Sequence, residues 1–129
     1  MYTTITLIFS FFAGWIGFLS IPFSELETAI AEGDAQEIVQ HAGSKVIIQI
    51  DNKEGVYSKS QGTQVLQSFF NDHPTEKFSF EFKGREDKTQ SYAFGTYHSM
   101  VDFKLSIKFK LKEKSIYVIE SVIIAKIEN

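Results

Sequence analysis

The 129-residue chain contains no cysteine. Disulfide bonds, thiolate nucleophiles and cysteine-ligated metal sites are therefore excluded, and so is a lipoprotein anchor, which needs a cysteine at the cleavage point. Arginine is almost as scarce, because Arg85 is its single occurrence. Arginine is the side chain that reads bases and holds phosphates through paired hydrogen bonds. We therefore expect no nucleic-acid binding.

Motifs that specify a reaction are missing as well. The chain has no glycine-rich phosphate loop, nucleophile elbow or dinucleotide-binding fingerprint. Its three histidines, His41, His73 and His98, do not stand at metal-ligand spacing from one another. We therefore expect no metal and no cofactor, and a binding protein is favoured over an enzyme. His41 and His73 each lie near a predicted helix C-terminus, where partial positive charge is favourable in any protein, so both are interpreted as structural.

Charge is absent near the N-terminus, where residues 5–23 form an uncharged, mostly apolar run. The main interpretation is a cleaved export signal, with Ser20 and Ser24 as candidate cleavage points, although a basic start is lacking. A retained membrane anchor and a buried helix are the alternatives. We expect an exported bacterial protein, periplasmic or extracellular, or one tethered to the inner membrane by residues 5–23. The predicted domain covers residues 24–129, and residues 1–23 are the signal or anchor.

Apolar and aromatic residues, in contrast, are plentiful. Hydrophobic residues make up 43% of the chain, with thirteen phenylalanines and five tyrosines among them. This composition is typical of a globular protein, and the length allows one domain. We expect a single core with many aromatic side chains.

Capping patterns predict three helices. Ser24–Glu27 and Asp34–Glu37 each place an N-cap residue three positions before a glutamate. The two short helices that follow end at Gly33 and Gly43. The third pattern, Ser58–Gln61, begins a longer helix. The apolar stripe of that helix consists of Val65, Leu66, Phe69 and Phe70.

Alternation of apolar and polar residues predicts the strands. They cover residues 45–50, 56–57, 78–83, 92–98, 101–111 and 116–127. Phe78, Phe80 and Phe82 are assigned to one face of their strand. The last strand is apolar on both faces, which is typical of a central strand. This order of elements predicts an α+β domain, with short helices packed on a strongly curved, mostly antiparallel sheet.

Four stretches carry a resemblance to a known family. They are Ala29–Ala35, Tyr57–Gln61, Phe69–Phe70 and Tyr92–Tyr97, within about residues 25–125. The chain resembles a family of small exported bacterial proteins of unknown function with a nuclear transport factor 2-like, or cystatin-like, cone-shaped fold. The resemblance implies the fold but no activity. The wider fold family includes isomerases, dehydratases, hydrolases and pure binding domains on one cone-shaped cavity, so fold alone does not define function.

Pocket candidates come from aromatic and titratable side chains in the strands and in the third helix. Glu120 interrupts the apolar face of the last strand, where burial would make a carboxylate a better base. A buried tyrosine could donate to a developing oxyanion, and His98 shares a predicted face with Tyr92. Asp102 is predicted to point to the opposite face of its strand from the apolar residues. The candidates are Tyr92, Phe94, His98, Glu120, Phe69, Phe80 and Phe103.

A stripe of lysines alternates with the apolar residues of the strand at 101–111. Its members are Lys104, Lys108, Lys110 and Lys112. A solvated strand face is the main interpretation, and docking on an anionic surface is the alternative. The function we expect is non-catalytic binding of a small apolar ligand or a protein partner. The alternatives are a cavity enzyme of isomerase or dehydratase type and a homodimeric structural or assembly protein.

Overall fold

The computed structural model describes residues 21–85, 88–113 and 116–128. Its helices are α2 (Phe23–Glu32), α3 (Ala35–Val39) and α4 (Lys59–Asp72). Its strands are β1 (Ala42–Ile50), β2 (Lys53–Ser58), β3 (Lys77–Arg85), β4 (Gln90–His98), β5 (Asp102–Glu113) and β6 (Ile116–Lys126). Within these described ranges, no helix is long and apolar enough to cross a membrane.

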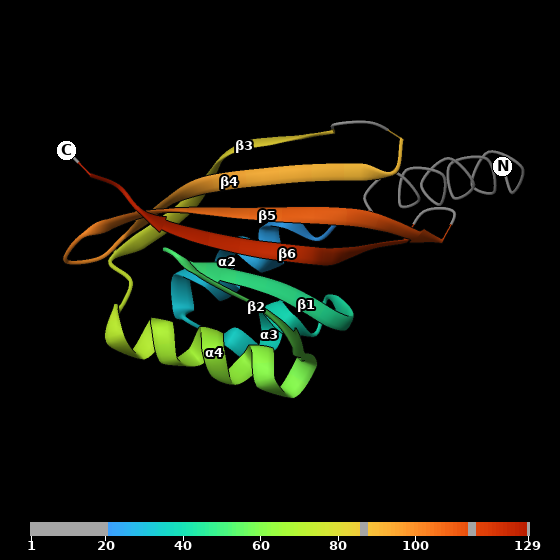
Figure 1. Cartoon of the computed structure of the whole chain (residues 1–129). Coiled ribbons are helices and arrows are strands. Elements are labelled where there is room, and N and C mark those ends of the chain that lie inside the picture. The colour runs from blue at the N-terminus through green and yellow to red at the C-terminus, as the bar shows by residue number, and fades with distance from the viewer. Residues whose placement is uncertain (1–20, 86–87, 114–115, 129) are drawn as a thin grey trace, which may run out of the picture.

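The six strands form one sheet in the order β2-β1-β6-β5-β4-β3. Strands β1 and β6 are parallel, and every other neighbouring pair is antiparallel. The three described helices lie on one side of the sheet, with α4 alongside the β1–β2 hairpin (Figure 1). The α+β class and the mostly antiparallel sheet are confirmed, and β6 is a central strand as predicted.

The core lies between the helices and the sheet face that they cover, here called the inner face. The opposite face is called the outer face. Buried and more exposed residues alternate strictly along β4, and they alternate along β5 up to Lys110 except at the buried Ser106, because successive side chains point to opposite faces. The buried inner-face residues include Val46, Ile48, Ala93, Tyr97, Phe103, Leu105, Ile107, Phe109, Val122 and Ile124. The helices add Leu26, Ile30, Ile38, Val39, Leu66, Phe69 and Phe70.

Two of the three predicted caps are present. The Asp34 side chain accepts a hydrogen bond from the Glu37 N–H at 3.1 Å, and Ser58 with Gln61 forms a reciprocal capping box. The prediction of Ser24 as an N-cap is wrong. Helix α2 begins at Phe23, two residues earlier than a Ser24 cap implies, with Pro22 as its N-cap and no side-chain cap.

The first two helices end differently from each other. Gly33 follows α2 in the left-handed conformation with φ 67°, which glycine adopts without steric cost. The predicted end of the second helix at Gly43 is wrong. Helix α3 ends at Val39, and Gly43 already belongs to β1. Strand β1 starts this early because the Ile119 N–H donates to the His41 carbonyl, which joins the chain to β6.

A register shift in β3 shows that the predicted face of Phe82 is wrong. Phe80 pairs with Gly95 but Phe82 pairs with Phe94, so Glu81 is an extra residue in β3. Phe82 therefore lies on the outer face and not beside Phe78 and Phe80. Strict alternation in the sequence cannot reveal this change, because a one-residue bulge reverses the faces of every residue beyond it.

The last part of the uncharged run belongs to the folded domain. The Phe23 ring packs edge to face against Phe80 and Phe109, with centroids 5.9 and 5.7 Å away. Ile21 also packs against the core. The predicted export signal or anchor otherwise falls on residues 1–20, which lie outside the described residues.

Candidate functional site

An open groove of about 850 Å³ lies between α4 and the β1–β2 hairpin. Its apolar lining consists of Ile50, Val56, Tyr57, Val65 and Phe69. Its polar lining consists of Lys53, Gln61, Gln64, Ser68, Asp72 and His73. The volume is within the range of about 300–1,000 Å³ that small-molecule sites usually have.

The groove lies along the edge of the sheet, where α4 packs beside β1 and β2. Strand β2 is an edge strand that pairs with β1 from Lys45↔Ser58 to Ile50↔Lys53. Alternation along β2 directs Lys53 and Tyr57 toward the inner face, where α4 lies. Gly62 keeps the first turn of α4 close to the sheet, because a Cβ there would lie 2.9 Å from the Val46 side chain. Tyr57, Val65 and Phe69 thus give the groove a buried or half-buried apolar surface, bordered by polar side chains of α4.

Aromatic stacking holds one end of the groove. The His73 ring lies 4.9 Å, between centroids, from the rings of both Phe69 and Phe103. The backbone carbonyl of His73 accepts a hydrogen bond from the Tyr97 hydroxyl, which in turn accepts one from Thr75 at 2.8 Å. Burial raises the pKa of Tyr97 above its ordinary value, and the hydrogen bond from Thr75 partly offsets this. These two hydrogen bonds join the loop after α4 to the inner face of β4.

The structure separates the predicted pocket candidates. Phe69 lines the groove, and Phe103 lies behind it in the core. Phe80 is also on the inner face but packs against Phe78 and Phe23, under α2. Of the seven candidates, Phe69 alone lines the groove.

Two aromatic candidates lie on the opposite side of the sheet. Tyr92 and Phe94 are half-buried on the outer face, with Phe82 stacked on Phe94 at 5.5 Å. The Lys104 ammonium lies 4.5 Å from the Phe94 ring centre. The Tyr92 hydroxyl hydrogen-bonds to Ser106, at 3.4 Å. These side chains pack against one another, and none of them lines the groove.

His98 and Asp102 form an outer-face pair at the turn between β4 and β5. The His98 Nδ1 lies 3.1 Å from the Asp102 carboxylate. Both side chains are substantially solvent-exposed, and Asp102 points away from the apolar residues of β5 as predicted. Neither residue lines the groove.

Glu120 lies at an irregularity in β6 and does not interrupt the inner face. Phe109 pairs with Ile119, but the next residue back, Lys108, pairs with Ser121, so Glu120 is an extra residue. Ile119 therefore lies on the inner face with Val122 and Ile124. The prediction that Glu120 interrupts this apolar face is wrong. One Glu120 oxygen is buried without a hydrogen-bond partner among the described residues. Glu120 lines neither described cleft.

The lysine stripe lies along β5, opposite the buried side chains. Lys104 and Lys110 are exposed on the outer face, and Lys108 is half-buried beside Tyr92. Lys112 is exposed near the strand end. The lysines thus form a solvated strand face, and this face carries the aromatic residues Tyr92 and Phe94 as well.

Most of the groove was missed by the sequence analysis. Its polar rim comes from one side of α4, at Gln61, Gln64, Ser68 and Asp72. This spacing follows the helical repeat, so a polar stripe bordering the apolar stripe was visible in the sequence. The sequence does not reveal that β2 is an edge strand, which leaves this polar side of α4 open to solvent.

Among the described residues, one group of three could hold a metal ion. Glu25, Glu37 and His41 place one ligand atom each within 4.8 Å of the others. Glu25 lies in α2, Glu37 in α3 and His41 in the turn after α3, and none of them lines the groove.

This architecture, helices over one face of a curved sheet with an open groove at one side, is that of the nuclear transport factor 2-like and cystatin-like folds. A cystatin-like domain of unknown function from Nostoc punctiforme matches with a TM-score of 0.61 at 8% identity, covering 82% of this chain and 73% of its own. Residues 23–125 match the family described as domain of unknown function DUF4783, and the chain belongs to that family.

Two crystal structures of the same family are similar to the chain throughout. The protein from Bacteroides ovatus is 26% identical, with a TM-score of 0.76 over 85% of this chain and 98% of its own. The protein from Bacteroides uniformis is 24% identical, with the same TM-score over 84% of this chain and 99% of its own. No curated protein sequence matches the chain. The suspected family and fold are thereby confirmed.

Proposed function

We propose that this protein is a non-catalytic binding domain whose groove between α4 and the β1–β2 hairpin takes a small, mainly apolar ligand. The observation that carries the proposal is the mixed lining of the 850 Å³ groove. Apolar side chains form its floor, and polar groups from one side of α4 form its rim. An apolar surface with a few polar groups that fix orientation is the usual composition of a small-molecule site.

The placement of the acid–base candidates supports binding over catalysis. Glu120, Tyr92 and His98 do not line the groove. Tyr92 and His98 are separated from it by the sheet itself. A general acid or base must come within about 3 Å of the proton that it transfers, so these three side chains cannot serve a ligand in the groove.

Lys53 offers one cationic contact to a ligand in the groove. Lys53 stands at the end of the groove that His73 and Asp72 also line. A ligand with an aromatic body and a single anionic group can cover Tyr57 and Val65 while its charge lies near Lys53. The probe 8-anilinonaphthalene-1-sulfonate has this composition.

The test is calorimetric titration of this probe into the wild type and two matched variants. Ser68 is exposed in α4 and lines the groove, whereas Ser60 is exposed in the same helix and does not. We expect wild-type binding with a Kd of about 10–100 μM, loss of at least about ten-fold in S68W by filling of the groove, and no change in S60W. Equal affinity of S68W and S60W would refute the proposal.

A second candidate is homodimer formation through the outer face. The 48% exposed Phe82, stacked on Phe94, favours it. The lysines of β5 on the same face oppose it, because two copies would bring like charges together. Light scattering over the micromolar range, on wild type and F82A, measures this: a dimer that F82A dissociates would support the candidate.

The export prediction is retained as part of the proposal. It is supported by the uncharged run at residues 5–23. Because Ile21 and Phe23 pack against the core, cleavage after Ser20 leaves the domain intact, whereas cleavage after Ser24 removes the start of α2. Mass spectrometry of the protein recovered from the periplasm or the medium therefore distinguishes the two cleavage points.

A further inference from the structure

A second, smaller cleft of about 350 Å³ opens between α2 and α3. Four carboxylates line it, and no lysine or arginine does. The lining residues are Ser24, Glu25, Thr28, Ala29, Glu32, Asp34 and Glu37. Carboxylates gathered in a narrow space raise the local concentration of cations. The cleft has no residue in common with the α4 groove, so what it binds is independent of the proposed function.

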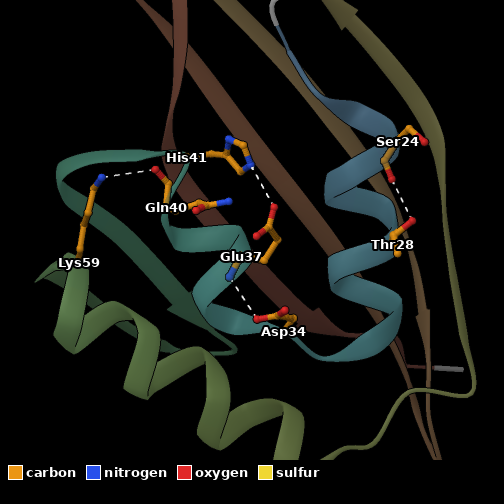
Figure 2. A network of polar contacts seen from close by, with 7 residues as sticks. All are labelled: Ser24, Thr28, Asp34, Glu37, Gln40, His41 and Lys59. Atoms are coloured by element: carbon orange, nitrogen blue, oxygen red, sulfur yellow. Dashed lines mark hydrogen bonds and ion pairs between the residues drawn. The ribbon is translucent and has the colours of Figure 1, made fainter.

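His41 adds a nitrogen ligand at the edge of this acidic cleft. Glu37 and His41 are four residues apart, and their side chains point toward one another (Figure 2). The His41 Nε2 lies 3.8 Å from the Glu37 Oε1, which is too far for a hydrogen bond. Nε2 is buried and has no hydrogen-bond partner among the described residues. A buried, unpaired ring nitrogen is costly, and a bound cation would satisfy it.

Glu25 supplies a third ligand from the other helix. The ligand atoms of Glu25, Glu37 and His41 all lie within 4.8 Å of one another. Ligand atoms of a tetrahedral zinc ion, at about 2.0–2.2 Å from the metal, are separated by about 3.4 Å. Since Glu25 is exposed, rotation of its side chain can close the remaining gap without moving the backbone.

The backbone holds these ligands in place before any ion binds. The turn at Gly33 folds α3 back against α2, and the Gln67 side chain of α4 bonds both the Gly33 carbonyl and the Ala35 N–H. The His41 carbonyl accepts a hydrogen bond from Ile119 at 2.9 Å. Ligands on elements fixed in this way lose little entropy on binding.

We propose that Glu25, Glu37 and His41 form a binding site for a divalent transition-metal ion of the Zn²⁺ type, which cross-links α2 to α3. One imidazole with two carboxylates suits Zn²⁺ and its neighbours, whereas Mg²⁺ and Ca²⁺ favour oxygen ligands throughout. Water completes the coordination. The spacing of the three histidines from one another does not reveal this site, because its ligands are one histidine, a glutamate four residues before it and a glutamate of another helix.

The test is a calorimetric titration of ZnCl₂ into the metal-free full chain at pH 7. We expect one Zn²⁺ per chain, with a Kd of about 1 μM or tighter, and a raised melting temperature. H41A should weaken binding by at least about 100-fold, and E37Q and E25Q each by about ten-fold or more. Because Glu25 is exposed, E25Q tests the site even if H41A fails to fold.

The matched control is H98A. His98 and Asp102 repeat the four-residue spacing of a histidine and a carboxylate, with 3.1 Å between the ligand atoms, but they belong to no group of three among the described residues. Zinc affinity should be unchanged in H98A. The proposal is overturned if the wild type binds no Zn²⁺ below about 100 μM, if E25Q binds as tightly as wild type, or if H98A weakens binding as much as H41A.

Discussion

The hydroxyl of Tyr97 donates a hydrogen bond to the backbone carbonyl of His73. Tyr97 is fully buried on the inner face of β4, and His73 follows the last residue of α4. This bond, with the one that Tyr97 accepts from Thr75, fastens the end of α4 to the sheet. It thereby fixes the end of the groove where His73 and Phe69 lie.

Loss of the Tyr97–His73 hydrogen bond should destabilise the protein. Y97F removes the hydroxyl and leaves the His73 carbonyl without this partner, while the Thr75 hydroxyl keeps only its 3.4 Å contact with the Ile30 carbonyl. The change should lower the free energy of unfolding by about 1–3 kcal/mol. Urea denaturation followed by circular dichroism measures it. Y92F is the control, because the Tyr92 hydroxyl makes a 3.4 Å contact on the half-buried outer face. A loss in Y92F as large as that in Y97F would contradict the account.

A pH dependence follows from the raised pKa of Tyr97. The folded state holds this proton to higher pH than the unfolded state does, where the ordinary value is 10.0. The stabilisation is therefore complete below pH 10 and is lost as pH rises toward the pKa of the folded state. Stability measured from pH 8 to 11 should fall more steeply in wild type than in Y97F. Parallel curves for the two proteins would be the contrary result.

Phe23 gives a prediction about where the domain begins. F23A removes the contacts with Phe80 and Phe109 and should destabilise the fold by about 2–4 kcal/mol. F82A, which removes a half-exposed ring of the same size, should cost under about 1 kcal/mol. Chemical denaturation of both variants checks this. If F23A were the milder change, α2 would not be anchored through its first residue.

Gly95 gives a prediction about the β3–β4 pair. A Cβ at this position would lie 2.2 Å from the Ser79 carbonyl oxygen across the pair. G95A should therefore force the strands apart and cost about 1–3 kcal/mol or more. At Gly43, the nearest atom to an added Cβ is 4.0 Å away, so G43A should leave stability nearly unchanged. Thermal melts of the two variants compare them directly.

Local patterns predicted the elements well because each depends on nearby residues. The Asp34 cap, the Ser58–Gln61 capping box and the alternation along β5 all follow from interactions within a few positions. The Ser24 cap failed for a tertiary reason. Glu27, its expected partner, instead accepts a hydrogen bond at 2.7 Å from the Phe80 N–H of β3. Competition between a local and a distant partner cannot be decided from sequence.

The candidate site was harder to predict than the fold. The extra residues Glu81 and Glu120 reverse the faces of β3 and β6, so alternation placed Phe82 and Glu120 wrongly. The groove needs an edge strand that leaves one side of α4 uncovered, and strand order is a property of the whole sheet. The sequence could therefore name Phe69 but not the residues that surround it.

The most direct test of the proposed function is to map the bound probe on the protein. Amide chemical shifts in ¹H–¹⁵N spectra, recorded while 8-anilinonaphthalene-1-sulfonate is added, locate the site residue by residue. The account predicts changes concentrated at residues 53–57 and 61–73, with the amides of β4 around Tyr92 and Phe94 unchanged. Changes centred on Tyr92, Phe94 and Phe82, or none below millimolar probe, would contradict it.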